Sequence, residues 1–236
     1  MSIEKPNFNK PESPDAKNES EEKYENGNIT FFAEGAKNNG QIEIAKNITE
    51  TIAPYMDNKV HVQYKKIKAE NPGFNSRLNP KFRDENYHDS ITINSDYQYQ
   101  DELPFILAHE LGHSFEEKLE QIVKNDEVET LPVGMDDEYA DFYADLIAVY
   151  ILRPELLKKL EDIPAGQNTL LAIQKMFSGN DFTELRTKLN LLPHPKTTIE
   201  PDSEEEMERK ARLDKLFERV FDKINEYINQ KYTREN

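Results

Sequence analysis

Residues His109-Glu110-Leu111-Gly112-His113 contain two histidines four positions apart around a glutamate, and this stretch decides which fold and chemistry we expect. In an α-helix, positions i and i+4 lie on one face, about 6 Å apart along the axis. Both imidazoles can therefore reach one metal ion. Glu110 projects about 100° away from them, where it can act as a general base on water instead of binding the metal. This pattern is typical of zinc hydrolases.

The residues around this stretch predict the helix that such chemistry requires. Asp101 can cap its start, and no Gly or Pro follows Pro104 before Lys124 except Gly112. A glycine inside a helix costs about 1 kcal/mol relative to alanine, which is tolerable where another segment packs closely beside the metal. The alternative is an ordinary amphipathic helix with two surface histidines. Under either reading the helix itself is predicted by apolar residues that recur at three- and four-residue steps: Leu103, Ile106, Leu107, Leu111, Phe115, Leu119 and Ile122.

A second helix, expected over residues 136–152, offers the third protein ligand that catalytic zinc sites typically use. Acids at the start of a helix complement its dipole, which accounts for Asp137 and Glu138 but not for Asp141 or Asp145. The latter two stand among apolar residues, where an acid needs a partner. We expect one of them to bind the metal and the other to accept the second N–H of an imidazole.

The stretch 106–113, preceded by the strand-like segment 90–94, resembles the ImmA/IrrE family of zinc metallopeptidases. In the second helix, Asp141-Phe-Tyr-Ala-Asp145 followed by Pro154 fits the family's register, although Asp stands where the family usually has a Glu ligand and Arg153 stands where it has Met. The resemblance implies a zincin-type helical core beside a small sheet, with Asp141 as the third ligand and Asp145 supporting a histidine.

Two alternatives for the third ligand stay open. A register that starts at Asp137 also satisfies the first half of the family pattern, but it misplaces the proline by one helical turn. Glu138, which is longer than Asp141 and lies about one turn earlier, is the main rival ligand.

His194 is a further candidate, because Leu192-Pro-His194-Pro195 followed by Arg209 and Arg212 is similar to a segment of HtpX-like peptidases. The similarity implies that His194 stabilises an oxyanion or covers the open position on the zinc. The alternative is a histidine in an exposed proline turn. His61 and His88 have no comparable spacing, and we expect them to be ordinary residues.

Composition narrows the function classes. The chain has no cysteine, which excludes disulfides, thiolate zinc sites and cysteine-protease chemistry. Its net charge of −16 argues against direct nucleic-acid binding.

Residues 1–28 have almost no apolar side chains and are expected to form a disordered acidic tail with no signal peptide or membrane anchor. The longest apolar run, 146–152, is too short to span a membrane, so we expect a soluble cytoplasmic protein.

The remaining pattern predicts an α+β fold with three domains or segments: the tail 1–28, a zinc metallopeptidase domain over 29–194, and a C-terminal amphipathic helix over 195–236. The segment around Ile91 to Ser95 is expected to be an edge strand that holds an extended peptide. Strands are expected over 28–33, 59–65 and 91–94, helices over 41–55, 156–160, 169–177, 182–191 and 203–232, and a loop over 71–90.

The apolar face of the last helix normally would pack on its own domain, but it could instead form a dimer or a docking surface for a substrate. Its members are Leu213, Leu216, Phe217, Val220, Phe221, Ile224, Tyr227 and Ile228.

We therefore expect a zinc-dependent endopeptidase in which His109, His113 and Asp141 hold Zn²⁺ and Glu110 is the catalytic base. The family resemblance implies a specific intracellular substrate, often a DNA-binding repressor of the helix-turn-helix type. The alternative is a non-catalytic partner-binding protein, or a toxin-type protein, on the same fold.

Overall fold

The computed structural model describes residues 23–68, 71–76, 89–126, 140–191 and 204–232. Its base is a five-stranded mixed sheet with the strand order β1-β2-β3-β5-β4. The central pairs β2–β3 and β3–β5 are parallel, and both edge strands are antiparallel to their neighbours. The strands are β1 (Lys23–Asn26), β2 (Ile29–Phe32), β3 (Val60–Lys65), β4 (Gly73–Ser76) and β5 (Asp89–Asn94).

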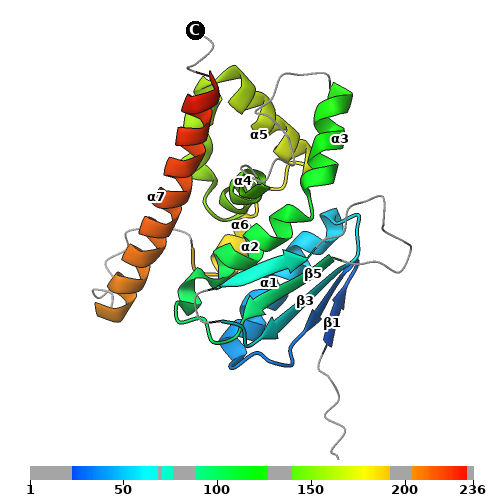
Figure 1. The fold of residues 1–236 in the computed structure, drawn as a ribbon, viewed down its shortest axis with the longest axis vertical. Coiled ribbons are helices and arrows are strands. Elements are labelled where there is room, and N and C mark those ends of the chain that lie inside the picture. The colour runs from blue at the N-terminus through cyan, green and yellow to red at the C-terminus, as the bar shows by residue number, and fades with distance from the viewer. Residues whose placement is uncertain (1–22, 69–70, 77–88, 127–139, 192–203, 233–236) are drawn as a thin grey trace, which may run out of the picture.

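Helices cover one face of this sheet (Figure 1). Side chains alternate along β2 and β3, so that one set is buried under α1 (Asn39–Ile52) and α2 (Leu103–His113). Tyr64 of β3 marks the buried side, because its hydroxyl donates to the Gln41 carbonyl of α1 at 3.0 Å. On the other side, Phe32 and His61 stack edge to face and are only half-buried.

Three expectations about the sheet are wrong. Residues 23–26 form β1, although we expected a disordered tail as far as residue 28, because Tyr24 stacks on Phe31 and Lys46 lies over the Tyr24 ring. The expected loop 71–90 contains β4, which has little apolar character and is ordered by pairing with β5. Consequently β5 is an interior strand, and β4 is the edge strand beside α2.

A second helical layer lies on the side of α2 away from the sheet (Figure 1). Its centre is α4 (Ala140–Leu152), in which every residue from 142 to 152 is buried, as expected of a helix that is apolar on all sides. The remaining described elements before the C-terminal helix are η1 (Ala53–Tyr55), η3 (Gln100–Glu102), α3 (Glu116–Asp126), η4 (Pro154–Asp162), α5 (Pro164–Met176) and α6 (Thr183–Lys188).

The helix that carries the two histidines is shorter than its pattern predicts. It ends at His113, where Ser114 and Phe115 donate to the carbonyls of Leu111 and Gly112, and α3 then leaves in a different direction (Figure 1). The change of direction buries Phe115 against Phe177 of the next layer. Asp101 also does not cap α2, since it lies in η3 and pairs with Arg212 at 3.2 Å.

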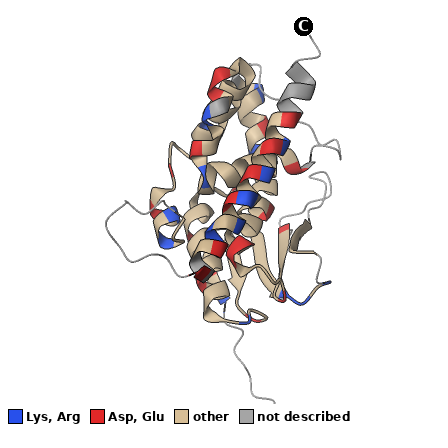
Figure 2. Cartoon of the chain, turned by 90° about the vertical axis from the view of Figure 1, so that its left-hand side faces the viewer, with Lys and Arg blue, Asp and Glu red and all other residues tan. Residues whose placement is uncertain are grey.

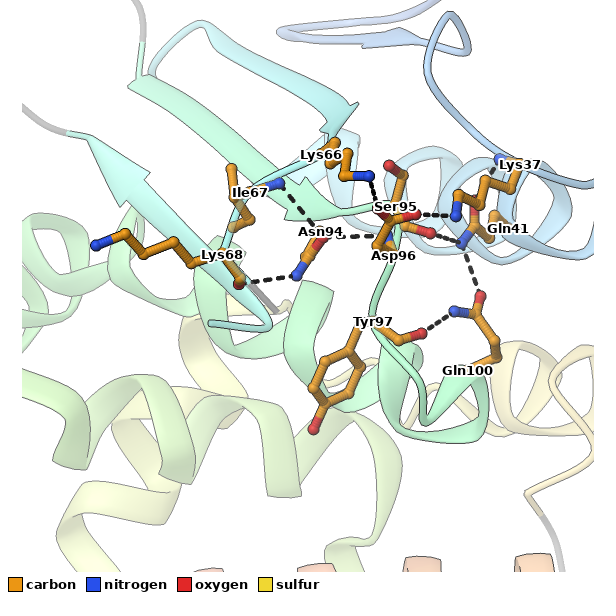
Figure 3. Close-up of polar contacts among 10 residues, drawn as sticks. All are labelled: Lys37, Gln41, Lys66, Ile67, Lys68, Asn94, Ser95, Asp96, Tyr97 and Gln100. Carbon is orange, nitrogen blue, oxygen red and sulfur yellow. Dashed lines mark hydrogen bonds and ion pairs between the residues drawn. The ribbon is translucent and has the colours of Figure 1, made fainter. Parts of the chain in front are cut away.

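The turn between β5 and α2 is fixed by buried polar side chains (Figure 3). Asn94 is fully buried; its side chain accepts from the Asp96 N–H at 3.0 Å and donates to the Lys68 carbonyl at 3.2 Å. Gln41 of α1 donates to the Ser95 carbonyl at 3.2 Å and to Gln100 at 2.7 Å. These contacts tie α1, the 66–72 segment and the start of α2 together.

The C-terminal helix α7 (Glu204–Tyr232) packs against α4 (Figure 1). Its apolar face is buried against its own domain at five positions, which confirms the first of the two readings and makes the alternative, a docking or dimer surface, wrong for these five residues. Phe217 packs edge to face on Phe105 of α2, and the Arg153 guanidinium lies 5.2 Å from the Phe217 ring centre. The side chains of Tyr227 and Ile228 and the segment 195–202 lie outside the described residues. The buried residues are Leu213, Phe217, Val220, Phe221 and Ile224.

Within the described ranges, no helix is both long enough and apolar enough to cross a membrane.

Candidate metal centre

The candidate centre is built where α2 and α4 cross, and Gly112 permits that crossing. A Cβ atom at Gly112 would lie 2.9 Å from the Ala144 Cα and 3.0 Å from the Ala144 carbonyl oxygen, which is closer than such atoms normally approach. The two backbones therefore touch. The close packing that we expected at Gly112 is confirmed, and it brings the acids of α4 over the histidines of α2.

His109 and His113 lie on one face of α2, with their ring centres 4.9 Å apart. Each Nδ1 contacts a buried carboxylate at 2.8 Å: Asp145 for His109 and Glu116 for His113. An ionised carboxylate can only accept a hydrogen bond, so each Nδ1 carries the proton, and in the neutral ring the Nε2 lone pair is left to bind a metal.

The third residue of the group is Asp141. Its Oδ1 lies 3.6 Å from His113 Nε2 and 4.0 Å from His109 Nε2. With metal–ligand distances of about 2.0–2.2 Å, ligand atoms around a tetrahedral zinc ion lie roughly 3.4 Å apart. The spacing of the three side chains therefore fits one ion, and this group could hold a metal.

The structure thus brings together the three residues expected as ligands. Asp145 also makes the contact with a histidine expected of it. The alternatives Asp137 and Glu138, the proline-turn residue His194, and His88 all lie outside the described residues.

Asp141 differs from expectation in its surroundings. Its side chain is 73% exposed, whereas Asp145 is 6% exposed as a residue. Asp141 lies in the first turn of α4, before the fully buried part of the helix begins. Of these two acids, Asp145 alone is buried among apolar residues.

Glu116 is a residue of the candidate centre that sequence reasoning missed. It lies three positions after His113, a spacing at which helical neighbours meet, and the turn into α3 keeps it buried beside the ring. Together with Asp145 it gives both histidines the same arrangement, an acid on Nδ1.

The environment of His109 favours a basic imidazole. Burial alone lowers the pKa of His109, but the hydrogen bond and charge of Asp145, with smaller contributions from Glu110 and Asp141, outweigh it and raise the pKa. A more basic imidazole is a better electron donor to a metal.

Glu110 lies on a different side of α2 and is buried. Burial raises the pKa of its carboxyl group, while the charges of His109 and His113 and a backbone hydrogen bond from Asn75 act in the opposite direction. A second contact from the edge strand fixes the backbone, because Asn75 Nδ2 donates to the Glu110 carbonyl at 2.8 Å and to Ser114 Oγ at 3.1 Å. Sequence reasoning missed Asn75, since it lay in the expected loop.

A cleft of about 370 Å³ opens beside the histidines. His109 and Glu110 of α2 line it together with Pro72 and Tyr97, and α7 contributes Arg219 and Lys223. A substrate in this cleft would contact both α2 and the C-terminal helix.

Comparison with known proteins gives no match: no family model, no curated protein and no solved structure is significantly similar to this chain.

Proposed function

We propose that this chain is a zinc-dependent endopeptidase that cleaves a specific intracellular protein. The observation that supports this best is the arrangement of the two histidines, each with an acid on Nδ1 and with Nε2 close to Asp141, beside the buried carboxyl group of Glu110.

The donor set favours zinc. Two imidazole nitrogens and one carboxylate oxygen, in a chain without cysteine, match the nitrogen and oxygen ligands of catalytic zinc and leave one position for water or substrate. When bound, the ion would polarise a peptide carbonyl and make water acidic enough to lose a proton near neutral pH.

Side chains of the protein would then transfer the proton of the attacking water and hold the ligands in place. Glu110 accepts it from the attacking water and delivers it to the amine that leaves when the peptide bond breaks. Asp145 and Glu116 hold the two rings in orientation through Nδ1. Asn75 holds the backbone of Glu110 against the sheet.

Strand β4 supports the proposal of a peptide substrate. It is the edge strand next to α2, and Phe74 on it is 41% exposed. An extended peptide could add to this edge and run past the histidines, since main-chain hydrogen bonds give affinity without requiring a particular sequence.

We further propose that the core is of the zincin type and related to the ImmA/IrrE peptidases, on the basis of the motif and register described above. A DNA-binding repressor of the helix-turn-helix type is then the proposed substrate.

The test combines metal content with activity. The purified protein is expected to carry about one zinc per chain, His109→Ala to lose it, and Glu110→Gln to keep zinc and fold while losing hydrolysis by several orders of magnitude. Elemental analysis and cleavage of the regulator encoded beside the gene measure the two properties. Equal zinc in the wild type and His109→Ala, or normal cleavage by Glu110→Gln, would refute the proposal. Zinc binding without any cleavage would favour the non-catalytic alternative.

A further inference from the structure

We infer that the α7 side of the cleft is a subsite for a carboxylate of the peptide, held by Arg219 and Lys223. The inference rests on the proposed peptidase function, and it assigns a substrate preference to the same site.

The two cations lie side by side on α7, next to the cleft. Arg219 and Lys223 lie four residues apart on α7, so they are neighbours on one side of the helix. Both line the same cleft as His109 and Glu110. The rotation of α7 is fixed by Val220 and Ile224, which follow the two cations in sequence and are buried. The basic pair therefore cannot turn away from the cleft without exposing the apolar face.

The second step is that no ion pair engages these two side chains within the described structure. The other arginines at this interface are paired, Arg153 with Asp214 at 2.9 Å and Arg212 with Asp101 at 3.2 Å. Neither Arg219 nor Lys223 forms an ion pair with a described carboxylate. Arg219 donates its Nε–H to the Lys215 carbonyl at 3.3 Å, and its charge counters the rise in the pKa of Tyr97.

The acids of the cleft are mostly engaged. Glu102 accepts a hydrogen bond from Tyr97 at 2.7 Å, and Asp145 contacts His109. Figure 2 shows α7 on the face turned to the viewer, with basic and acidic residues interleaved along it. The cations that reach the cleft thus remain available for a ligand.

Charge decides which ligand fits. The chain carries a net charge of −16, so an acidic peptide would be repelled from most of its surface. A guanidinium and an ammonium on adjacent turns of α7 line the cleft, and a carboxylate can accept from both. Because the pair lies at a fixed place relative to His109 and Glu110, binding a carboxylate there would select which peptide bond lies over the histidines.

Two sources could supply this carboxylate: an Asp or Glu side chain within the peptide, or the free carboxyl terminus of the peptide. The experiment separates them. Zinc-loaded Glu110→Gln protein, which should bind without cleaving, is titrated into fluorescent short peptides of Ala, Gly and Ser. One set is amidated and carries a single Glu or a single Gln at each position in turn; the other set has no acid and ends in a free carboxylate or an amide.

We expect a carboxylate-bearing peptide to bind about tenfold more tightly than its neutral counterpart. This preference should disappear when Arg219→Gln and Lys223→Gln are combined. Lys158→Gln is the matched control, because Lys158 is an exposed cation on η4 that does not line the cleft. Zinc content and melting temperature of each variant show that the fold is retained.

The inference is overturned if charged and neutral peptides bind equally or not at all, if the double variant keeps the preference, or if Lys158→Gln loses it as well. A preference confined to the free carboxyl terminus still supports the subsite and identifies that terminus as its ligand. Failure of the proposed function gives a different result. In that case the wild type cleaves nothing, but its Glu110→Gln form still prefers acidic peptides through Arg219 and Lys223. The peptidase proposal would then be refuted, and the carboxylate subsite would be supported.

Discussion

At the scale of single residues, the acids that contact the histidine Nδ1 atoms support a metal site as strongly as the two histidines themselves do. Asp145 and Glu116 are both buried, so each must be stabilised by the imidazole that it contacts. Their presence on Nδ1 leaves one nitrogen of each ring for a metal, which is a stronger statement than the spacing of the histidines alone.

Replacing Asp145 by Asn should weaken zinc binding by about 10-fold, because the amide oxygen still accepts from Nδ1 but no longer carries a charge. Glu116→Gln should have a similar effect through His113. Competition with a chromogenic chelator measures both affinities. Asp214→Asn is the control, since this acid pairs with Arg153 on the surface. Wild-type affinity in both site variants would contradict the supporting role.

Asp141→Ala should reduce zinc affinity more than Asp137→Ala or Glu138→Ala, because Asp141 is the acid whose oxygen lies close to both Nε2 atoms. The same chelator competition applies. A larger loss in Glu138→Ala would move the third ligand one turn toward the start of the helix.

At the scale of secondary-structure elements, the centre depends on how closely α2 and α4 approach. Gly112→Ala would add a Cβ at 2.9 Å from the Ala144 Cα, so one helix must move. We expect a loss of about 1–3 kcal/mol in the free energy of unfolding, typical of overpacking, together with weaker zinc binding. Denaturant titration and chelator competition give the two values.

The double change Gly112→Ala with Ala144→Gly serves as the control. It should not restore stability, because the closest atoms of Ala144 belong to its backbone. Full rescue by the second change would mean that the Ala144 side chain sets the helix separation.

The arrangement of these elements also explains which parts of the fold and of the candidate centre could be predicted from the sequence. His109, Glu110 and His113 follow from helical spacing, and Asp145 from its apolar neighbours, because these signals are local. Strand β4 and Asn75 could not be predicted, since four residues with one large apolar side chain become a strand only by pairing with β5. The end of α2 at His113 depends on Phe115 finding Phe177, a contact between segments distant in sequence.

At the scale of the whole molecule, α7 joins the sheet-side helix α2 to the central helix α4 and completes one side of the cleft. Phe217→Ala should therefore lower the free energy of unfolding by about 3–5 kcal/mol, the usual cost of emptying a buried aromatic position. Met207→Ala, at a residue 52% exposed on the same helix, should change it by less than about 0.5 kcal/mol. Equal effects in denaturant titrations would mean that α7 does not belong to the folded body.

The exposure of Asp141 should also determine how fast a bound metal ion exchanges. The two histidines are held by buried acids, whereas the carboxylate opposite them is 73% exposed and lies in the first turn of its helix. One side-chain rotation, on a scale of nanoseconds or less when no ion restrains it, is enough to open that side of the centre. Metal exchange would then require no unfolding of the core, and a chelator should remove the ion at a rate that rises with chelator concentration while the backbone amides of α4 stay protected from hydrogen exchange.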